Sequence, residues 1–171
     1  GGMLAAFAIS KGDAFWTYSG GLAGIITASA GNDLYHPIQA MIIGGIGTAI
    51  AYKMHFWVER RFKIDDAVGA VAVHGYAGFV GVVIAGFVLW GHPSSVFEGY
   101  AAINPLGQLA GAVIMFGVLG FLPGWIVAKI LNGVGMLRIP KEVELLGLDF
   151  ASNQDQRAAE TDVREAEKAL V

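Results

Sequence analysis

Four long apolar runs dominate the sequence and limit what the chain can fold into. A helix needs roughly 20 mostly apolar residues to cross the hydrocarbon core of a bilayer. The runs of this kind cover approximately residues 14–31, 36–58, 66–90 and 105–131. Only 15% of the chain is charged and 55% is hydrophobic, which is not the balance of a soluble domain. The sequence therefore predicts an all-α membrane protein whose transmembrane helix bundle covers residues 1–131.

The distribution of Lys and Arg predicts how these spans are oriented. Cytoplasmic loops of membrane proteins carry an excess of basic side chains. Here such side chains precede the first span, separate the second from the third, and lie at or beyond the end of the fourth: Lys11, Lys53, Arg60, Arg61, Lys63, Lys129, Arg138 and Lys141. The opposite connections, "GNDLYHP" and "GHPSSVFEGYAAINP", contain neither Lys nor Arg. We therefore expect a multi-pass protein of the plasma (inner) membrane with a cytoplasmic C-terminus.

Residues 132–171 are predicted to form a cytoplasmic C-terminal tail. Residues 142–171 contain eight acidic and three basic side chains, so this part is acidic. We expect a charged helix over residues 153–171 with a Glu160–Arg164 pair, and its thin apolar stripe favours a solvated helix over a coiled-coil seam. The chain contains no cysteine, which excludes disulfides and thiolate metal sites. We expect no metal, no cofactor and no nucleic-acid partner.

A single histidine interrupts the third apolar run. In "DDAVGAVAVHGYAG", Asp65 or Asp66 can cap a helix start, where carboxylates meet free N–H groups. His74 then lies roughly 13 Å further along a continuous helix, near the membrane midplane. A neutral imidazole at that depth can bind a small polar molecule or pass a proton. The same position equally suits a histidine that only hydrogen-bonds between helices.

Glycine recurs at three- and four-residue spacing after this histidine. Gly75, Gly78 and Gly81 give the helix small surfaces on which neighbouring backbones can approach closely. Other glycines repeat this spacing on the first two spans: Gly20, Gly21, Gly24, Gly44, Gly45 and Gly47. We expect these glycines to serve helix packing and to leave room for only a narrow lumen.

These motifs resemble those of the ammonium transporter (Amt/Mep/Rh) family. The segment "IDDAVGAVAVHGYAGFVGVVIAGF" is similar to the family signature DDPxGAxxVHGxxGxxGxxxxGxF, and "GMLRIPKEVELLGLD" is similar to the tail motif GLRVxxExExxGLD. The similarity extends over about residues 1–149. Two positions depart from the family pattern: the proline after the double aspartate is Ala67 here, and the HGE-like ending after Asp149 is absent.

The resemblance implies a fold and a function. It implies about the last four helices of an eleven-helix ammonium transporter fold, with residues 2–9 as the end of the preceding helix. It implies a homotrimer that moves ammonium or ammonia through one narrow pore per subunit, and no enzymatic activity. Two pore histidines act as a proton relay in this family; His74 matches the second, and the first would come from the N-terminal part of the transporter. Nitrogen-regulatory P-II proteins are the expected partners of the tail.

Two other functions fit parts of the sequence. An ammonium sensor without appreciable flux would need the same pore histidine. A haem-bearing membrane anchor would need two imidazoles that face each other at one depth. His36 and His55 are nineteen residues apart, about 28 Å along a helix, and His92 follows the third span. His74 therefore has no such partner in this chain, and the haem anchor is the less favoured alternative.

Overall fold

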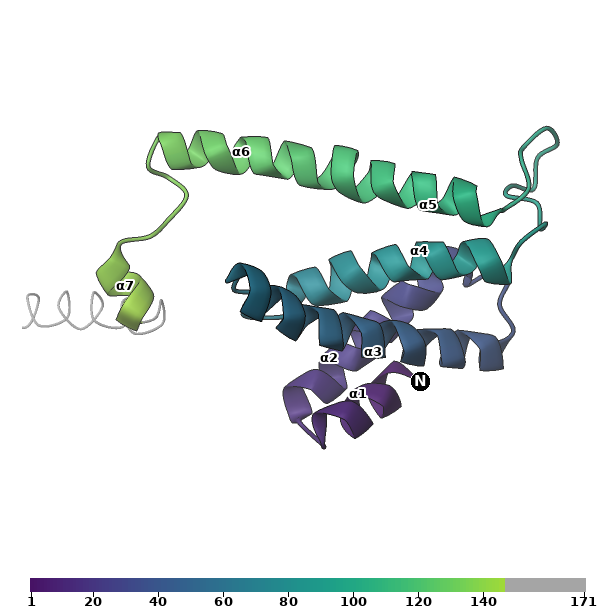
Figure 1. Cartoon of the computed structure of the whole chain (residues 1–171), viewed down its shortest axis with the longest axis horizontal. Coiled ribbons are helices and arrows are strands. Elements are labelled where there is room, and N and C mark those ends of the chain that lie inside the picture. Colours follow the sequence, from purple (N-terminus) through teal and green to yellow (C-terminus); the bar gives the residue numbers. More distant parts are fainter. Residues whose placement is uncertain (147–171) are drawn as a thin grey trace, which may run out of the picture. The chain divides into compact units, whose positions relative to one another are not determined.

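The computed structural model describes residues 1–146 as helices joined by loops, the longest of which covers residues 89–104 (Figure 1). Within these residues the only extended pairing is an isolated antiparallel bridge between Pro93 and Ala102. The helical fold class predicted from the sequence is therefore confirmed. The predicted tail helix with its Glu160–Arg164 pair lies outside the described residues, as does the end of the tail motif.

The helices follow the apolar runs in order. They are α1 (Gly2–Ser10), α2 (Ala14–Ala28), the 3-10 turn η1 (Ser29–Gly31), α3 (Pro37–Phe62), the π-helical segment η2 (Val71–Tyr76), α4 (Ala77–Val88), α5 (Pro105–Val113), the π-helical segment η3 (Ile114–Phe121), α6 (Leu122–Gly133) and α7 (Lys141–Leu146). Two continuous stretches, Val71–Val88 and Pro105–Gly133, are long and apolar enough to cross a membrane. Helix α2 has 15 residues and α3 has 26. That these two helices also cross the membrane stays a prediction.

Side chains at the helix starts explain where two of these helices begin. Asn104 Oδ1 accepts a hydrogen bond from the Gly107 N–H at 2.8 Å, which caps α5. His36 Nδ1 accepts from the Ile38 N–H at 3.3 Å, and Gln39 Oε1 accepts in return from the His36 N–H at 3.0 Å. This reciprocal pair satisfies donors that a helix start leaves free. His36 therefore has a structural role at the start of α3.

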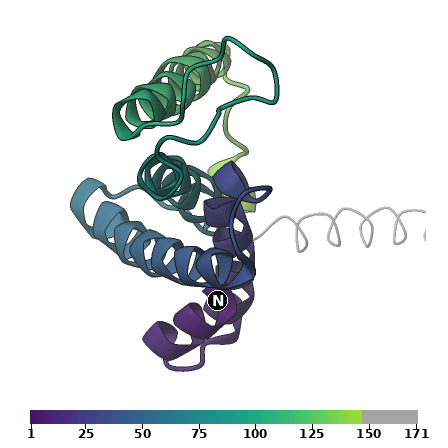
Figure 2. The ribbon, with the colours of Figure 1, turned by 90° about the vertical axis from the view of Figure 1, so that its right-hand side faces the viewer.

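Glycine allows the helices of the first compact unit, Gly1–Leu122, to approach each other closely. Helices α1, α2 and α3 lie side by side in this unit (Figure 2). A methyl group on Gly47 of α3 would lie 2.1 Å from Thr27 Oγ1, and one on Gly81 of α4 would lie 2.3 Å from the Thr27 carbonyl oxygen. Thr27 of α2 is 0% exposed. One residue of α2 thus meets a glycine on each of two other helices.

Two small apolar clusters lie between these helices. The first contains Tyr35, Ile43, Ala85, Leu89 and Ile103, and the second contains Ala23, Ala51, Val73 and Ala77. Burial raises the pKa of the Tyr35 hydroxyl, in the connection between α2 and α3, because the charged form loses its hydration. Many large apolar side chains are exposed instead, including Ile25, Phe87 and Leu119. Such a surface needs a partner or lipid to cover it.

The second unit, Pro123–Val171, is described as far as residue 146 and contains most of α6 together with α7. Arg138 and Glu144 form an exposed ion pair beside α7. Solvent and salt screen such a surface pair, so its contribution to stability is small.

We expect Gly81→Ala to destabilise the bundle, because its methyl group would lie 2.3 Å from a backbone oxygen that cannot swing aside. Overpacking of this kind costs about 1–3 kcal/mol. Gly111→Ala in α5 is the matched control, since nothing among the described residues lies within 4 Å of the added methyl group. Thermal unfolding in detergent should show a lower Tm for Gly81→Ala only. Equal Tm values for the two variants would contradict this account of α2–α4 packing.

Candidate functional site

His74 lies in the π-helical segment η2, and its side chain is exposed. The wide turn is marked by the Ala77 N–H, which donates to the Ala72 carbonyl oxygen five residues earlier. Turns of this type are rare and often occur at functional sites. Ala72 and Val73 are buried. The segment is therefore anchored through these residues, while His74 stands on an open face.

The helix that carries His74 starts later than the sequence predicts. The expected span begins at residue 66, whereas residues 63–69 are not helical and Ala70 is the first helical residue. Gly69 has a φ of +66°, and its N–H donates to the Asp66 carbonyl oxygen at 2.8 Å, which closes a turn before the helix. His74 therefore does not lie nine helical residues, about 13 Å, beyond Asp65, because residues 65–69 do not rise as a helix.

The start of the helix that carries His74 nevertheless lies beside α3. Asp66 Oδ2 lies 3.5 Å from Nδ1 of His55 in α3. His55 precedes the last residue of α3, Phe62, by seven positions, which is about 10 Å along the helix axis. Residues 63–69 thus turn back beside α3 and bring the start of the His74 helix next to His55.

Of the two adjacent carboxylates, Asp66 caps the helix. Its Oδ1 accepts from the Val71 N–H at 3.1 Å and its Oδ2 accepts from the Ala72 N–H at 2.9 Å. Both oxygens therefore satisfy donors at the positive end of the helix dipole. The Asp66 side chain is 12% exposed. Asp65 is exposed, and within residues 1–146 its side chain makes no hydrogen bond.

The three glycines after His74 have different surroundings. An added methyl group at Gly81 would meet the Thr27 backbone, and one at Gly78 would lie 3.2 Å from Phe116 Cζ. At Gly75 the nearest atom, at 3.5 Å, belongs to a side chain of its own helix. The two glycines further from His74 therefore lie at contacts with other elements. The surface next to His74 itself is open.

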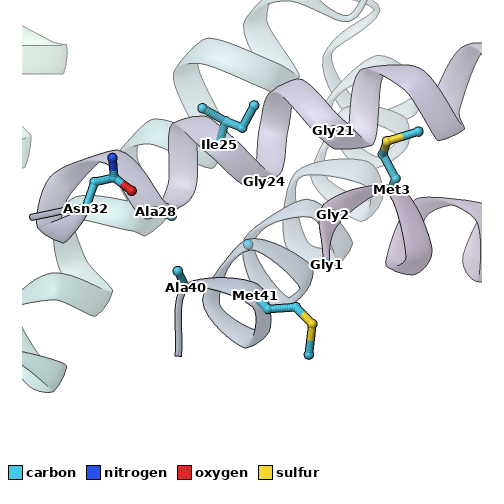
Figure 3. Close-up of a pocket in the computed structure, with 11 residues that line it drawn as sticks. Gly1, Gly2, Met3, Gly21, Gly24, Ile25, Ala28, Asn32, Ala40 and Met41 are labelled. Carbon is cyan, nitrogen blue, oxygen red and sulfur yellow. The ribbon is translucent and has the colours of Figure 1, made fainter. Parts of the chain in front are cut away.

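Three cavities are lined by other residues than His74. One groove of about 370 Å³ lies among α1, α2 and α3, and glycines, Met3, Ile25 and Met41 line much of it (Figure 3). A second, of about 570 Å³, is lined by Tyr52, Lys53, Phe56 and Arg60, and a third lies around Arg138.

His55 of α3 is a buried histidine beside the start of the His74 helix, a position that the sequence did not indicate. It is 8% exposed. Its ring packs edge-on against Trp16 and Phe56, with centroid distances of 4.8 and 4.9 Å. Asp66 follows it by eleven residues, and only the turn at residues 63–69 brings the two side chains together. No periodicity or motif in the sequence marks this contact.

Comparison with known proteins gives a consistent result. The sequence profile described as the Ammonium Transporter Family matches residues 1–158. Ammonium transporter Amt2 of Methanocaldococcus jannaschii is 34% identical over 90% of this chain and 36% of the relative. Ammonium transporter Amt1 of the same organism is 32% identical over 88% of this chain and 37% of the relative. The ammonium transporter of Corynebacterium glutamicum is 29% identical over 82% of this chain and 32% of the relative.

The chain spans about a third of the length of these curated relatives. No solved structure matches it.

Replacement of Asp66 by Ala should destabilise the protein more than replacement of Asp65 by Ala. Asp66→Ala removes the acceptors of two backbone N–H groups, and loss of a helix cap costs about 0.5–2 kcal/mol. Asp65→Ala removes an exposed side chain, and its effect should stay within about 0.5 kcal/mol. Unfolding in mixed detergent micelles measures both. A larger effect at Asp65 would overturn the assignment of the cap.

Proposed function

Because the chain belongs to the Ammonium Transporter Family, whose members are transporters rather than enzymes, we propose that it supplies the C-terminal part of an ammonium pore. The observation that carries the proposal is the exposed imidazole of His74 on a π-helical turn, within a match that covers residues 1–158. In this proposal α2, α3, η2–α4 and α5–η3–α6 correspond to the last four of eleven transmembrane helices.

The remaining pore wall comes from the N-terminal part of the transporter, encoded upstream or supplied by a second chain. The open face at His74 and the exposed apolar side chains of the bundle support this arrangement, since both need cover. The complete subunits form a homotrimer in the plasma membrane, with one pore each and the tail from residue 132 in the cytoplasm. A P-II regulatory protein is the proposed partner of that tail.

The proposed mechanism follows from the cost of burying charge. An ammonium ion that enters an apolar passage loses its hydration, so a narrow lumen rejects the bare cation. A neutral imidazole can accept a proton from ammonium, and ammonia then crosses as an uncharged molecule. The proton passes separately between His74 and a second histidine of the N-terminal part. Potassium has no proton to release, so the same passage excludes it.

The open surface beside His74 suits this role. Gly75 leaves space next to the imidazole, while Gly78 and Gly81 hold the helix against its neighbours. The haem alternative has less support, because His36 caps α3 and His55 packs against Asp66. The sensor alternative uses the same imidazole and differs only in flux.

His74→Ala in the complete transporter should lower ammonium flux about tenfold or more, or remove its discrimination against potassium, because proton transfer by a positioned side chain typically contributes at least that factor. Vesicles that contain the reconstituted protein report flux through ammonium-driven current and internal pH. His92→Ala is the matched control, since this imidazole is exposed and lies outside the helices. Unchanged flux and selectivity in His74→Ala would refute the relay. Ammonium binding without flux in the unmodified protein would favour the sensor.

The proposed orientation can be tested with single cysteines, because this chain contains none. Glu98 and Lys141 are both exposed and lie on opposite predicted sides of the membrane. We expect a membrane-impermeant maleimide to label Glu98→Cys in intact cells and to label Lys141→Cys only after permeabilisation. The reverse pattern would contradict a cytoplasmic C-terminus.

A further inference from the structure

We propose that His55 is a positioning residue, which holds the Asp66 carboxylate at the start of the His74 helix and thereby sets the orientation of the His74 ring. The effect on flux rests on the proposed transport function. The structural coupling between His55 and the helix start does not.

One carboxylate oxygen joins the two elements. Asp66 Oδ2 lies 3.5 Å from Nδ1 of His55 and also accepts the Ala72 N–H at 2.9 Å. The other oxygen accepts the Val71 N–H at 3.1 Å. Both side chains are largely buried, so water does not screen the contact strongly. A shift of the carboxylate toward or away from α3 therefore changes the cap at two successive residues.

The imidazole itself is held in place. The rings of Trp16 from α2 and Phe56 from α3 pack edge-on against it. Its Nδ1 is buried and has no hydrogen-bond partner within residues 1–146. A buried polar atom without a partner is unfavourable. Oδ2 of Asp66 lies 3.5 Å from Nδ1, just outside hydrogen-bond geometry, and a carboxylate oxygen is an acceptor that a protonated Nδ1 can use when the two atoms approach.

The link to His74 is short. Val71 and Ala72, which the carboxylate holds, precede His74 by three and two residues, within one helical turn. If these two N–H groups lose their acceptor, the first turn can fray. Since His74 lies in that turn and its side chain is exposed, its ring direction depends on the cap rather than on surrounding packing.

Hydrogen exchange in the complete transporter tests this coupling. His55→Phe keeps an aromatic ring but lacks a donor, and we expect it to accelerate exchange of the Val71 and Ala72 amides at least tenfold. His55→Gln retains an N–H donor and should keep both amides within threefold of the unmodified protein. His92→Phe is the control at an exposed histidine outside the helices and should change neither amide. NMR signals of the His74 ring should move in His55→Phe and return toward their original positions in His55→Gln.

Unchanged exchange in His55→Phe, or equal acceleration in His55→Phe and His55→Gln, would overturn the inference. If His55→Phe unfolds the whole bundle, His55→Gln decides: retained protection of the Val71 and Ala72 amides supports the role and lost protection refutes it.

Flux measurements separate this inference from the proposed function. Normal flux in His74→Ala would refute the relay and leave the exchange result standing. Lost flux in His74→Ala with unchanged exchange in His55→Phe would refute the inference alone.

Discussion

The arrangement of the first unit depends on close contact around Thr27, whose side chain meets Gly47 of α3 and whose backbone meets Gly81 of α4. Gly47 and Gly81 leave no room for a side-chain carbon at this point, so α2 lies directly against α3 and α4. In a membrane protein, where lipid offers apolar side chains no incentive to cluster, such van der Waals contact is a principal source of helix association. The contact also fixes the rotation of α4, because a glycine must face Thr27. The direction of the preceding segment, η2, follows from that rotation.

Two constraints therefore act on the short segment that carries His74. At its C-terminal side α4 is fixed by glycine packing, and at its N-terminal side Asp66 holds the first free N–H groups. Between these two points the chain makes a π-helical turn. Ala72 and Val73 of this segment are buried against its neighbours, whereas the His74 side chain is exposed. A polar side chain on a segment that is fixed at both ends can face an open space while the rest of its helix stays packed against other helices.

Much of this could be predicted from the sequence, and the missing parts have identifiable causes. The helical class and approximate helix positions follow from the apolar runs. The caps at His36 and Asn104 precede prolines, which suit a first helical position. The choice between Asp65 and Asp66 could not be made, because it depends on the positive φ of Gly69. The same turn creates the contact between His55 and Asp66, which no local pattern encodes.

The wide turn at η2 has a consequence for how the chain tolerates changes in length. A π-helical turn holds about one residue more than an α-helical turn, so it is the geometric equivalent of a single insertion. Removal of one residue between Val71 and Tyr76 can restore a regular α-helix and still keep both the Asp66 cap and the Thr27 seam, which is the contact between Thr27 and Gly81. Single-residue deletions elsewhere in the helix would turn its faces by about 100° and break that seam.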